Sequence, residues 1–240
     1  MEGKTHRLGG TVCAMAGFLT LKDSGYLIQS DLISPTLQFL VIYTAGIYGG
    51  MWPDNDHHWD SSPLKDPASW LQNKLLHLAN SPYKKLDERL SSKQKRSSVL
   101  YKTLKFMRCI HRSWQTHSEF TLLMILFLMY SPTFLGFTGR FDPLLWLLIV
   151  TGFGLGVISH LVLDMLTTEG VRFALGVFLK VFFPKVPIFT TIRLVPGISA
   201  FKTGSEWEMA IRKSLAIIQY GMLALVLLDL GGISVLQIFS

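Results

Sequence analysis

A histidine and a carboxylate stand four residues apart in the segment SHLVLDMLTTEG, at 159–170. In a helix, this spacing places the side chains of His160 and Asp164 on one face, one turn apart. The segment ends a long apolar stretch. An ionisable pair there indicates a functional site, because such groups are costly to bury in a membrane. The pair can hold a divalent metal ion if other parts of the chain supply further ligands.

Other histidines and acids also lie beside apolar segments. His6 precedes the first of them, PDNDHHWD (53–60) follows the second, and HRSWQTHS (111–118) precedes the third. Because each group lies at the same end of its predicted span, we expect four distant stretches to meet at one level of the membrane. The candidate metal ligands are His6, Asp54, Asp56, His57, His111, His117, His160 and Asp164.

This set of ligands suits hard or borderline divalent metals. Imidazole and carboxylate groups suit zinc, manganese or iron. The only cysteines are Cys13 and Cys109, so neither a thiolate zinc site nor a disulfide framework is indicated. We predict two or more divalent ions, zinc first and manganese as the alternative. Two ions about 3.5–4 Å apart activate water and stabilise an in-line displacement at phosphorus. A hydrogen-bonded histidine–carboxylate network without metal is the competing interpretation.

The composition indicates an integral membrane protein. Only 16% of the 240 residues are charged and the mean hydropathy is +0.36, whereas soluble domains carry about 25% charged residues. The clearest spans are 32–51, 119–138, 143–165 and 213–238. The weaker stretch 8–21 either continues to about 28 as a fifth span or forms a helix buried against the others. The predicted fold class is all-α, an integral membrane helical bundle of about five spans.

Basic residues indicate the orientation of these spans. Ten Lys and Arg residues lie between Lys84 and Arg112, against two acids. With five spans, only Lys22 and Arg140 of the 23 basic residues lie on the opposite side, so the basic side is cytoplasmic. The net charge of +7 would suggest nucleic acid in a soluble protein. Here topology and anionic lipid explain that charge more simply, and we expect no nucleic-acid partner.

The segments between the spans complete one predicted domain, 1–240. Residues 52–118 form a polar cytoplasmic insertion, and 166–212 form a re-entrant or interfacial segment. Residues 84–108 are either a basic amphipathic helix on the membrane surface or a solvated loop. Gly152, Gly154 and Gly156 indicate close helix contact, within the chain or between the chains of a homo-oligomer.

The motifs resemble those of the YdjM family of bacterial predicted membrane-bound metal-dependent hydrolases. That family has a histidine near the N-terminus, followed by PDxDH, HRGxTHS and SHxxxDxxTxxG. This chain has PDNDH, HRSWQTHS and SHLVLDMLTTEG at the matching places, and KTGSEWE (202–208) is similar to a later family segment. HRSWQTHS lacks the glycine and is one residue longer, so the turn that presents His111 and His117 must differ.

The resemblance implies an activity and a location. The family looks distantly like the superfamily of zinc-dependent phospholipases C and single-strand nucleases. This implies a hydrolase of phosphoesters or phospholipid headgroups in the bacterial inner membrane, with its active site facing the cytoplasm. Asp56 and His57 match either as metal ligands or as groups that orient them, and Asp54 or Asp56 could act as general base. Arg112, Arg172, Arg193 or Lys202 could neutralise a phosphate, an arginine by a bidentate contact.

Two other function classes are weighed against hydrolysis. One is a non-enzymatic membrane protein that binds or moves a divalent ion, and the other is a stress-response membrane scaffold. A transporter needs acids near the bilayer midplane, but Arg140 and Asp142 are the only charged residues in 120–158. An intramembrane metalloprotease is disfavoured because the sequence has no HExxH.

Overall fold

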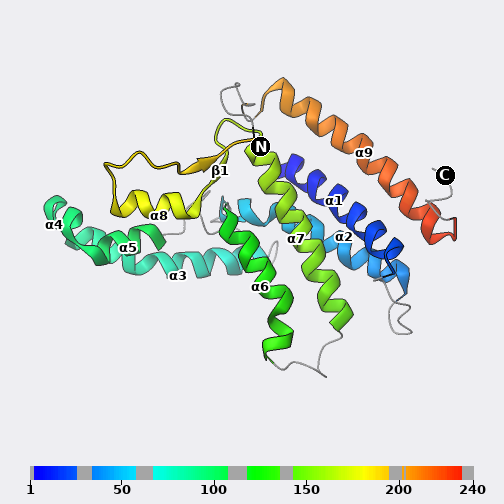
Figure 1. The fold of residues 1–240 in the computed structure, drawn as a ribbon, viewed down its shortest axis with the longest axis horizontal. Coiled ribbons are helices and arrows are strands. Elements are labelled where there is room, and N and C mark those ends of the chain that lie inside the picture. Colours follow the sequence, from blue (N-terminus) through cyan, green and yellow to red (C-terminus); the bar gives the residue numbers. More distant parts are fainter. Residues whose placement is uncertain are drawn as a thin grey trace. The chain divides into compact units, whose positions relative to one another are not determined.

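The computed structural model describes residues 3–25, 34–57, 67–107, 118–135, 143–194, 202 and 204–233. These residues are mostly helical, with one short two-stranded sheet (Figure 1). The all-α prediction is confirmed. The chain divides into two compact units. The first contains residues 1–52, 122–169 and 194–240, and the second contains 53–121 and 170–193.

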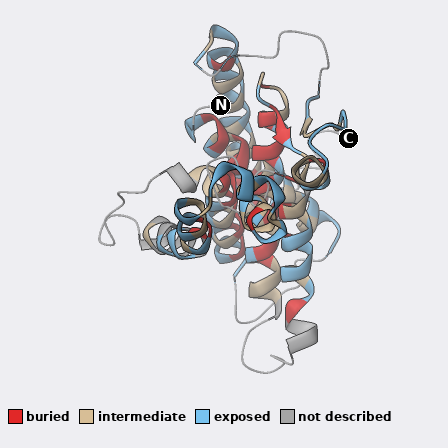
Figure 2. Ribbon diagram, turned by 90° about the vertical axis from the view of Figure 1, so that its left-hand side faces the viewer, coloured by how far each residue is buried: buried red, intermediate tan, exposed pale blue. Residues whose placement is uncertain are grey.

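The first unit is a group of packed helices. Its elements are α1 (Gly3–Asp23), α2 (Pro35–Met51), most of α6 (Glu119–Leu135), α7 (Pro143–Met165) and α9 (Glu206–Leu230). Helix α1 packs against α2, α7 and α9, and α2 packs against α7. The core is formed by Ala14, Met15, Phe18, Phe39, Ile42, Leu148 and Val226. Buried residues lie on the sides of the helices that face one another (Figure 2).

Two helices among the described residues are long and apolar enough to cross a membrane. They are Leu144–Met165 and Glu206–Leu230. Helix α2 has 17 residues, close to the roughly 20 that a span needs. The weak stretch 8–21 lies within α1, whose Ala14, Met15 and Phe18 are fully buried.

Helix α9 begins at Glu206, earlier than the predicted start at 213. The side chain of Ser205 accepts a hydrogen bond from the backbone N–H of Glu208 at 3.4 Å. Glu206 and Glu208 lie in the first turn, where acidic side chains stabilise the positive end of the helix dipole. The helix therefore extends into the predicted interfacial segment 166–212, because hydropathy alone does not detect a polar first turn with a cap.

Glycines allow α2 and α7 to approach closely. A Cβ atom at Gly152 would lie 2.4 Å from the carbonyl oxygen of Ile42, and one at Gly156 would lie 2.3 Å from that of Gly46. No side chain fits at either position. The predicted close contact is confirmed, and it lies within the chain.

An ion pair joins the C-terminal ends of α1 and α9. The Nζ atom of Lys22 lies 2.5 Å from the Oδ2 atom of Asp229, whose side chain is largely buried. The same ammonium group donates to the Asp229 backbone carbonyl at 3.2 Å. This contact is at the opposite end of α1 from His6, so the two ends of the helix carry different polar clusters.

The second unit contains shorter elements. They are η1 (Trp52–His57, of which Trp52 belongs to the first unit), α3 (Pro67–Arg89), α4 (Ser92–Ser97), α5 (Val99–Met107), β1 (Val171–Arg172), α8 (Ala174–Phe182) and β2 (Thr191–Ile192). Strands β1 and β2 are antiparallel, with Val171 opposite Ile192 and Arg172 opposite Thr191. The short apolar piece predicted at 173–183 is α8.

A single helix over 84–108 is not formed. Ser91 caps α4 in a capping box with Gln94, and Ser98 separates α4 from α5. The region is therefore three helices, since each cap satisfies backbone groups at a break. Helices α3 and α5 are linked by the hydroxyl of Tyr101, which lies 3.2 Å from that of Tyr83 and donates to Asp87 at 2.7 Å. These hydrogen bonds raise the pKa of Tyr101 above its usual range.

Candidate metal centre

Three of the predicted ligands meet in the first unit. The Nε2 atom of His6, from α1, lies 3.3 Å from Oδ1 of Asp164 in α7. The Nε2 atom of His160, also in α7, lies 3.4 Å from Oδ2 of Asp164. One ligand atom from each residue lies within 4.8 Å of the others, and all three side chains are fully buried. This group can hold one metal ion.

The local sequence explains why these residues meet. His160 and Asp164 share a face of α7 because they are one turn apart. His6 reaches them because α1 approaches α2 and α7 through glycine. A Cβ atom at Gly10 would lie 2.4 Å from the carbonyl oxygen of Gly46, and one at Gly50 would lie 2.7 Å from that of His6. The two imidazole rings stack, with their centroids 3.6 Å apart.

The backbone of α2 orients His160. Its Nδ1 atom lies 2.8 Å from the carbonyl oxygen of Gly50, and a carbonyl oxygen can only accept, so Nδ1 is the donor. In the neutral ring, Nε2 then carries the lone pair and faces the Asp164 carboxylate. Two electron-rich atoms at 3.4 Å repel unless a cation or a second proton lies between them. The hydrogen bond from Nδ1 to Gly50 is typical of metal-binding histidines, whose non-coordinating ring nitrogen donates to a carbonyl, a carboxylate or water.

A metal ion and a metal-free network satisfy this geometry in different ways. Without a metal, a hydrogen bond between Nε2 of His160 and Asp164 needs an additional proton, either on the imidazole or on the carboxyl group, since Nδ1 already donates to Gly50. That proton would lie in a fully buried group, beside the stacked ring of His6. A divalent ion satisfies both imidazoles and the carboxylate together, so the donor set fits a metal.

A buried glutamate beside the cluster was not predicted as a site residue. Glu208 of α9 is 2% exposed. Its Oε1 atom accepts from the Thr5 hydroxyl at 3.0 Å, and its Oε2 atom accepts from the Gly204 N–H at 2.7 Å. Thr5 precedes His6 in α1, so this carboxylate fixes the start of α9 to the helix turn that carries a candidate ligand. The Ser-x-x-Glu spacing at 205–208 was the available signal.

The other predicted site residues stay predictions. Asp54 lies half-buried in η1, in the second unit. The backbones of Asp56 and His57 are also in η1, but their side chains lie outside the described residues, as do His111, Arg112 and His117 entirely. Arg172 is exposed in β1, Arg193 follows β2, and Lys202 is exposed.

Packed apolar helices around a buried histidine–aspartate group define a class of helical membrane protein with a candidate metal site. The chain belongs to the family described as YdjM inner membrane protein, whose model matches residues 1–234. The resemblance read from the motifs is thus confirmed. A search of curated proteins and a search of solved structures each returned no match. The likeness to zinc-dependent phospholipases C and nucleases stays a prediction.

Proposed function

We propose that this protein is a metal-dependent hydrolase of phosphoesters or phospholipid headgroups at the cytoplasmic face of the inner membrane. The observation that carries the proposal is the buried group of His6, His160 and Asp164, with His160 oriented by the Gly50 carbonyl. Zinc is the expected ion, and manganese is the alternative, because the donors are imidazole and carboxylate.

Each residue of the group has a distinct part in the proposal. A bound divalent ion would supply Lewis-acid activation of water and charge for a phosphoryl oxygen. His6 and His160 would present Nε2 to it, and Asp164 would neutralise part of its charge. A second ion would be held by the further candidates, which are Asp54, Asp56, His57, His111 and His117. Asp54 or Asp56 would take the proton from the attacking water, and Arg112 would bind the phosphate.

The proposal includes a topology of five spans: α1, α2, α6, α7 and α9. The start of α1, the ends of α2 and α7, and the start of α9 would face the cytoplasm, consistent with the surplus of basic residues in 84–112. At that level the headgroups of the inner leaflet are the phosphoesters within reach. The proposed substrate class is therefore a lipid headgroup before a soluble polymer.

Turnover of a phosphoester panel tests the proposal. Purified full-length protein with zinc or manganese should hydrolyse at least one phosphomonoester, phosphodiester or phospholipid, and lose that activity in EDTA. The variants His160→Ala and Asp164→Ala should each lose at least 100-fold, on the order expected when a catalytic metal site is broken. His77→Ala, at an exposed position of α3, is the matched control and should keep full activity.

The panel also separates the competing function class. Bound metal without turnover of any member would contradict the hydrolase and favour a non-enzymatic divalent-metal-binding membrane protein. A folded protein that takes up no metal would favour a stress-response scaffold.

A further inference from the structure

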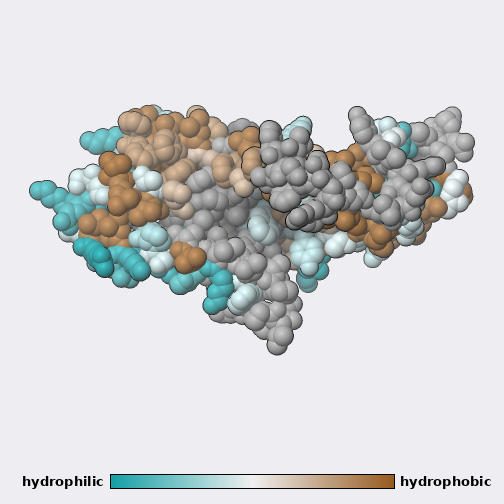
Figure 3. Space-filling model, turned by 90° about the horizontal axis from the view of Figure 1, so that it is seen from below, coloured by the Kyte–Doolittle hydropathy of each residue, from teal (hydrophilic) through white to brown (hydrophobic). Residues whose placement is uncertain are grey.

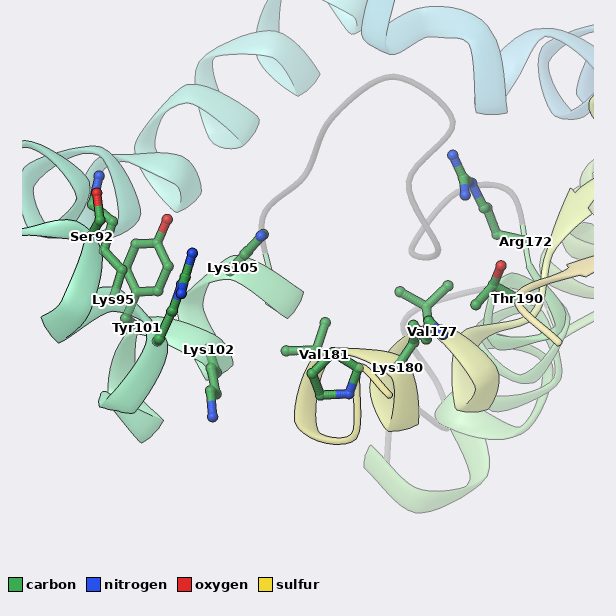
Figure 4. Close-up of a pocket in the computed structure, with 12 residues that line it drawn as sticks. Ser92, Lys95, Tyr101, Lys102, Lys105, Arg172, Val177, Lys180, Val181 and Thr190 are labelled. Carbon is green, nitrogen blue, oxygen red and sulfur yellow. The ribbon is translucent and has the colours of Figure 1, made fainter. Parts of the chain in front are cut away.

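The second unit contains a hollow of about 770 Å³, and half of the residues that line it are basic. They come from α4 and α5 on one side and from β1 and α8 on the other (Figure 4). The basic residues are Lys95, Arg96, Lys102, Lys105, Arg172 and Lys180. No acid is among the described residues that line the hollow. We call this hollow the basic pocket.

Most of these positive charges have no carboxylate partner among the residues that the structure describes. Lys95 pairs with Asp87 at 2.7 Å, and Lys180 donates to the carbonyl oxygen of Val186 at 2.9 Å. Across the part of the chain that the structure describes, no ion pair involves the other four. Like charges held around one hollow repel, and an anion inside relieves that repulsion.

The walls of the basic pocket are held by specific contacts. The rings of Phe106 in α5 and Phe178 in α8 meet edge to face, with centroids 5.2 Å apart. Gly176 lets α8 lie against the chain before β2, because a Cβ atom there would be 1.8 Å from the Phe189 carbonyl oxygen. The hollow is therefore built by packing between elements far apart in the sequence.

Exposed apolar side chains occur in the same unit. Phe189 is 87% exposed. Leu175, Phe178, Phe183 and Val186 are also exposed. In the left part of Figure 3, apolar and hydrophilic side chains lie next to one another on the surface. Apolar side chains beside lysine and arginine are the pattern of a surface that inserts into an anionic membrane interface. A binding site for a soluble polyanion would not require these exposed apolar side chains.

We propose that the basic pocket binds the phosphate headgroup of an anionic phospholipid, while the exposed side chains of α8 and of the segment before β2 enter the interfacial region of the bilayer. This inference goes beyond the proposed hydrolase. It assigns a lipid-binding surface to the second unit, and it requires neither metal nor turnover.

Lipid titration of the full-length protein tests the assignment. Protein in a neutral detergent with EDTA is titrated with phosphatidylglycerol, and bound lipid is counted by native mass spectrometry. The same titration is carried out with zwitterionic phosphatidylcholine and with glycerol 3-phosphate, which has no acyl chains. We expect saturable binding of phosphatidylglycerol and at least tenfold weaker binding in both other arms. The triple variant Lys102→Gln/Lys105→Gln/Arg172→Gln should lose about 100-fold in affinity, since each basic residue near an anionic surface contributes roughly a factor of five.

Matched control variants separate binding at the basic pocket from a general effect of the protein's net charge. Lys84→Gln/Lys85→Gln/Arg89→Gln removes three exposed charges from α3 and should bind phosphatidylglycerol within twofold of wild type. Lys102→Arg/Lys105→Arg keeps the charge and should also bind normally. If the triple pocket variant does not elute as a folded protein, Lys105→Gln alone replaces it, with an expected loss of about fivefold.

Three outcomes would overturn the proposal. The first is a pocket variant that binds phosphatidylglycerol like wild type. The second is an equal loss in the pocket and α3 variants, which would show nonspecific attraction. The third is glycerol 3-phosphate binding as tightly as the lipid, which would identify a soluble phosphate compound as the ligand.

Discussion

The Nδ1 atom of His160 faces the backbone carbonyl of Gly50, and this contact determines which ring nitrogen is left to bind a metal ion. Because Gly50 accepts that hydrogen bond, the Nε2 atom is turned toward Asp164 and His6. The pair in α7 was predictable from its spacing of four residues. The participation of His6 followed from the expected convergence of the helix ends. The hydrogen bond to Gly50 was not predictable, since every residue has a backbone carbonyl and the sequence does not indicate which one accepts.

Glu208 and Thr5 form a buried hydrogen bond that joins α9 to α1. They lie 203 positions apart, so no local pattern could indicate their contact. Thr5→Val should destabilise the protein by about 1–3 kcal/mol, because the buried Glu208 carboxylate loses a donor. Thermal unfolding in detergent measures the change.

Thr20→Val is the control for Thr5→Val. It removes an exposed hydroxyl of the same helix, which bonds only to the carbonyl oxygen of Ala16, and should have little effect. Equal midpoints for the two variants would show that the buried contact contributes nothing to stability.

Helix α7 is both a candidate membrane span and the helix that carries His160 and Asp164. Its glycines admit the backbone of α2 on one side, and its last turns carry His160 and Asp164. Hydropathy predicted its bounds well, because Pro143 starts it and apolar residues run almost to its end. Hydropathy did not indicate the first turn of α9 or the break at Ser91, because both depend on polar caps.

Gly156→Ala tests the approach of α2 and α7. The new methyl group would overlap the carbonyl oxygen of Gly46, 2.3 Å away, and overpacking of this kind costs about 1–3 kcal/mol. Since His160 lies one turn further along α7, we also expect weaker metal binding. Thermal unfolding and metal titration give the two readouts.

The control is Gly221→Ala in α9, where a Cβ atom would meet nothing within 4 Å. That variant should be neutral or slightly more stable, because alanine has the higher helix propensity. If Gly156→Ala were as well tolerated as Gly221→Ala, the close packing of the two helices would be refuted.

The first unit has a polar cluster at each end. The group of His6, His160 and Asp164 lies at the start of α1 and the end of α7, and the Lys22–Asp229 ion pair lies at the other end of α1. In the proposed topology, the end that carries His6 and His160 faces the cytoplasm, as the positive-inside rule predicts. The sequence analysis predicted one domain with a polar insertion at 52–118, and the described chain divides into two compact units. Residues 170–193 join the insertion through α8 and the strand pair, whose two-residue strands are too short to recognise in a sequence.

Cysteine labelling in whole cells tests this topology. In a background lacking Cys13 and Cys109, Ser24→Cys after α1 should react with a membrane-impermeant maleimide in intact cells whose outer membrane has been permeabilised. Ser97→Cys, exposed in α4, should react only after the inner membrane is opened. The reverse pattern, or labelling of both positions in intact cells, would rule out the five-span orientation.

The metal content of the purified protein tests the central claim most directly. Protein isolated without chelator should contain at least one equivalent of zinc or manganese by inductively coupled plasma mass spectrometry. His160→Ala and Asp164→Ala should each reduce it to background, and His77→Ala should leave it unchanged. If folded His160→Ala and Asp164→Ala proteins kept the full wild-type metal content, the buried histidine–aspartate group would not be the metal site.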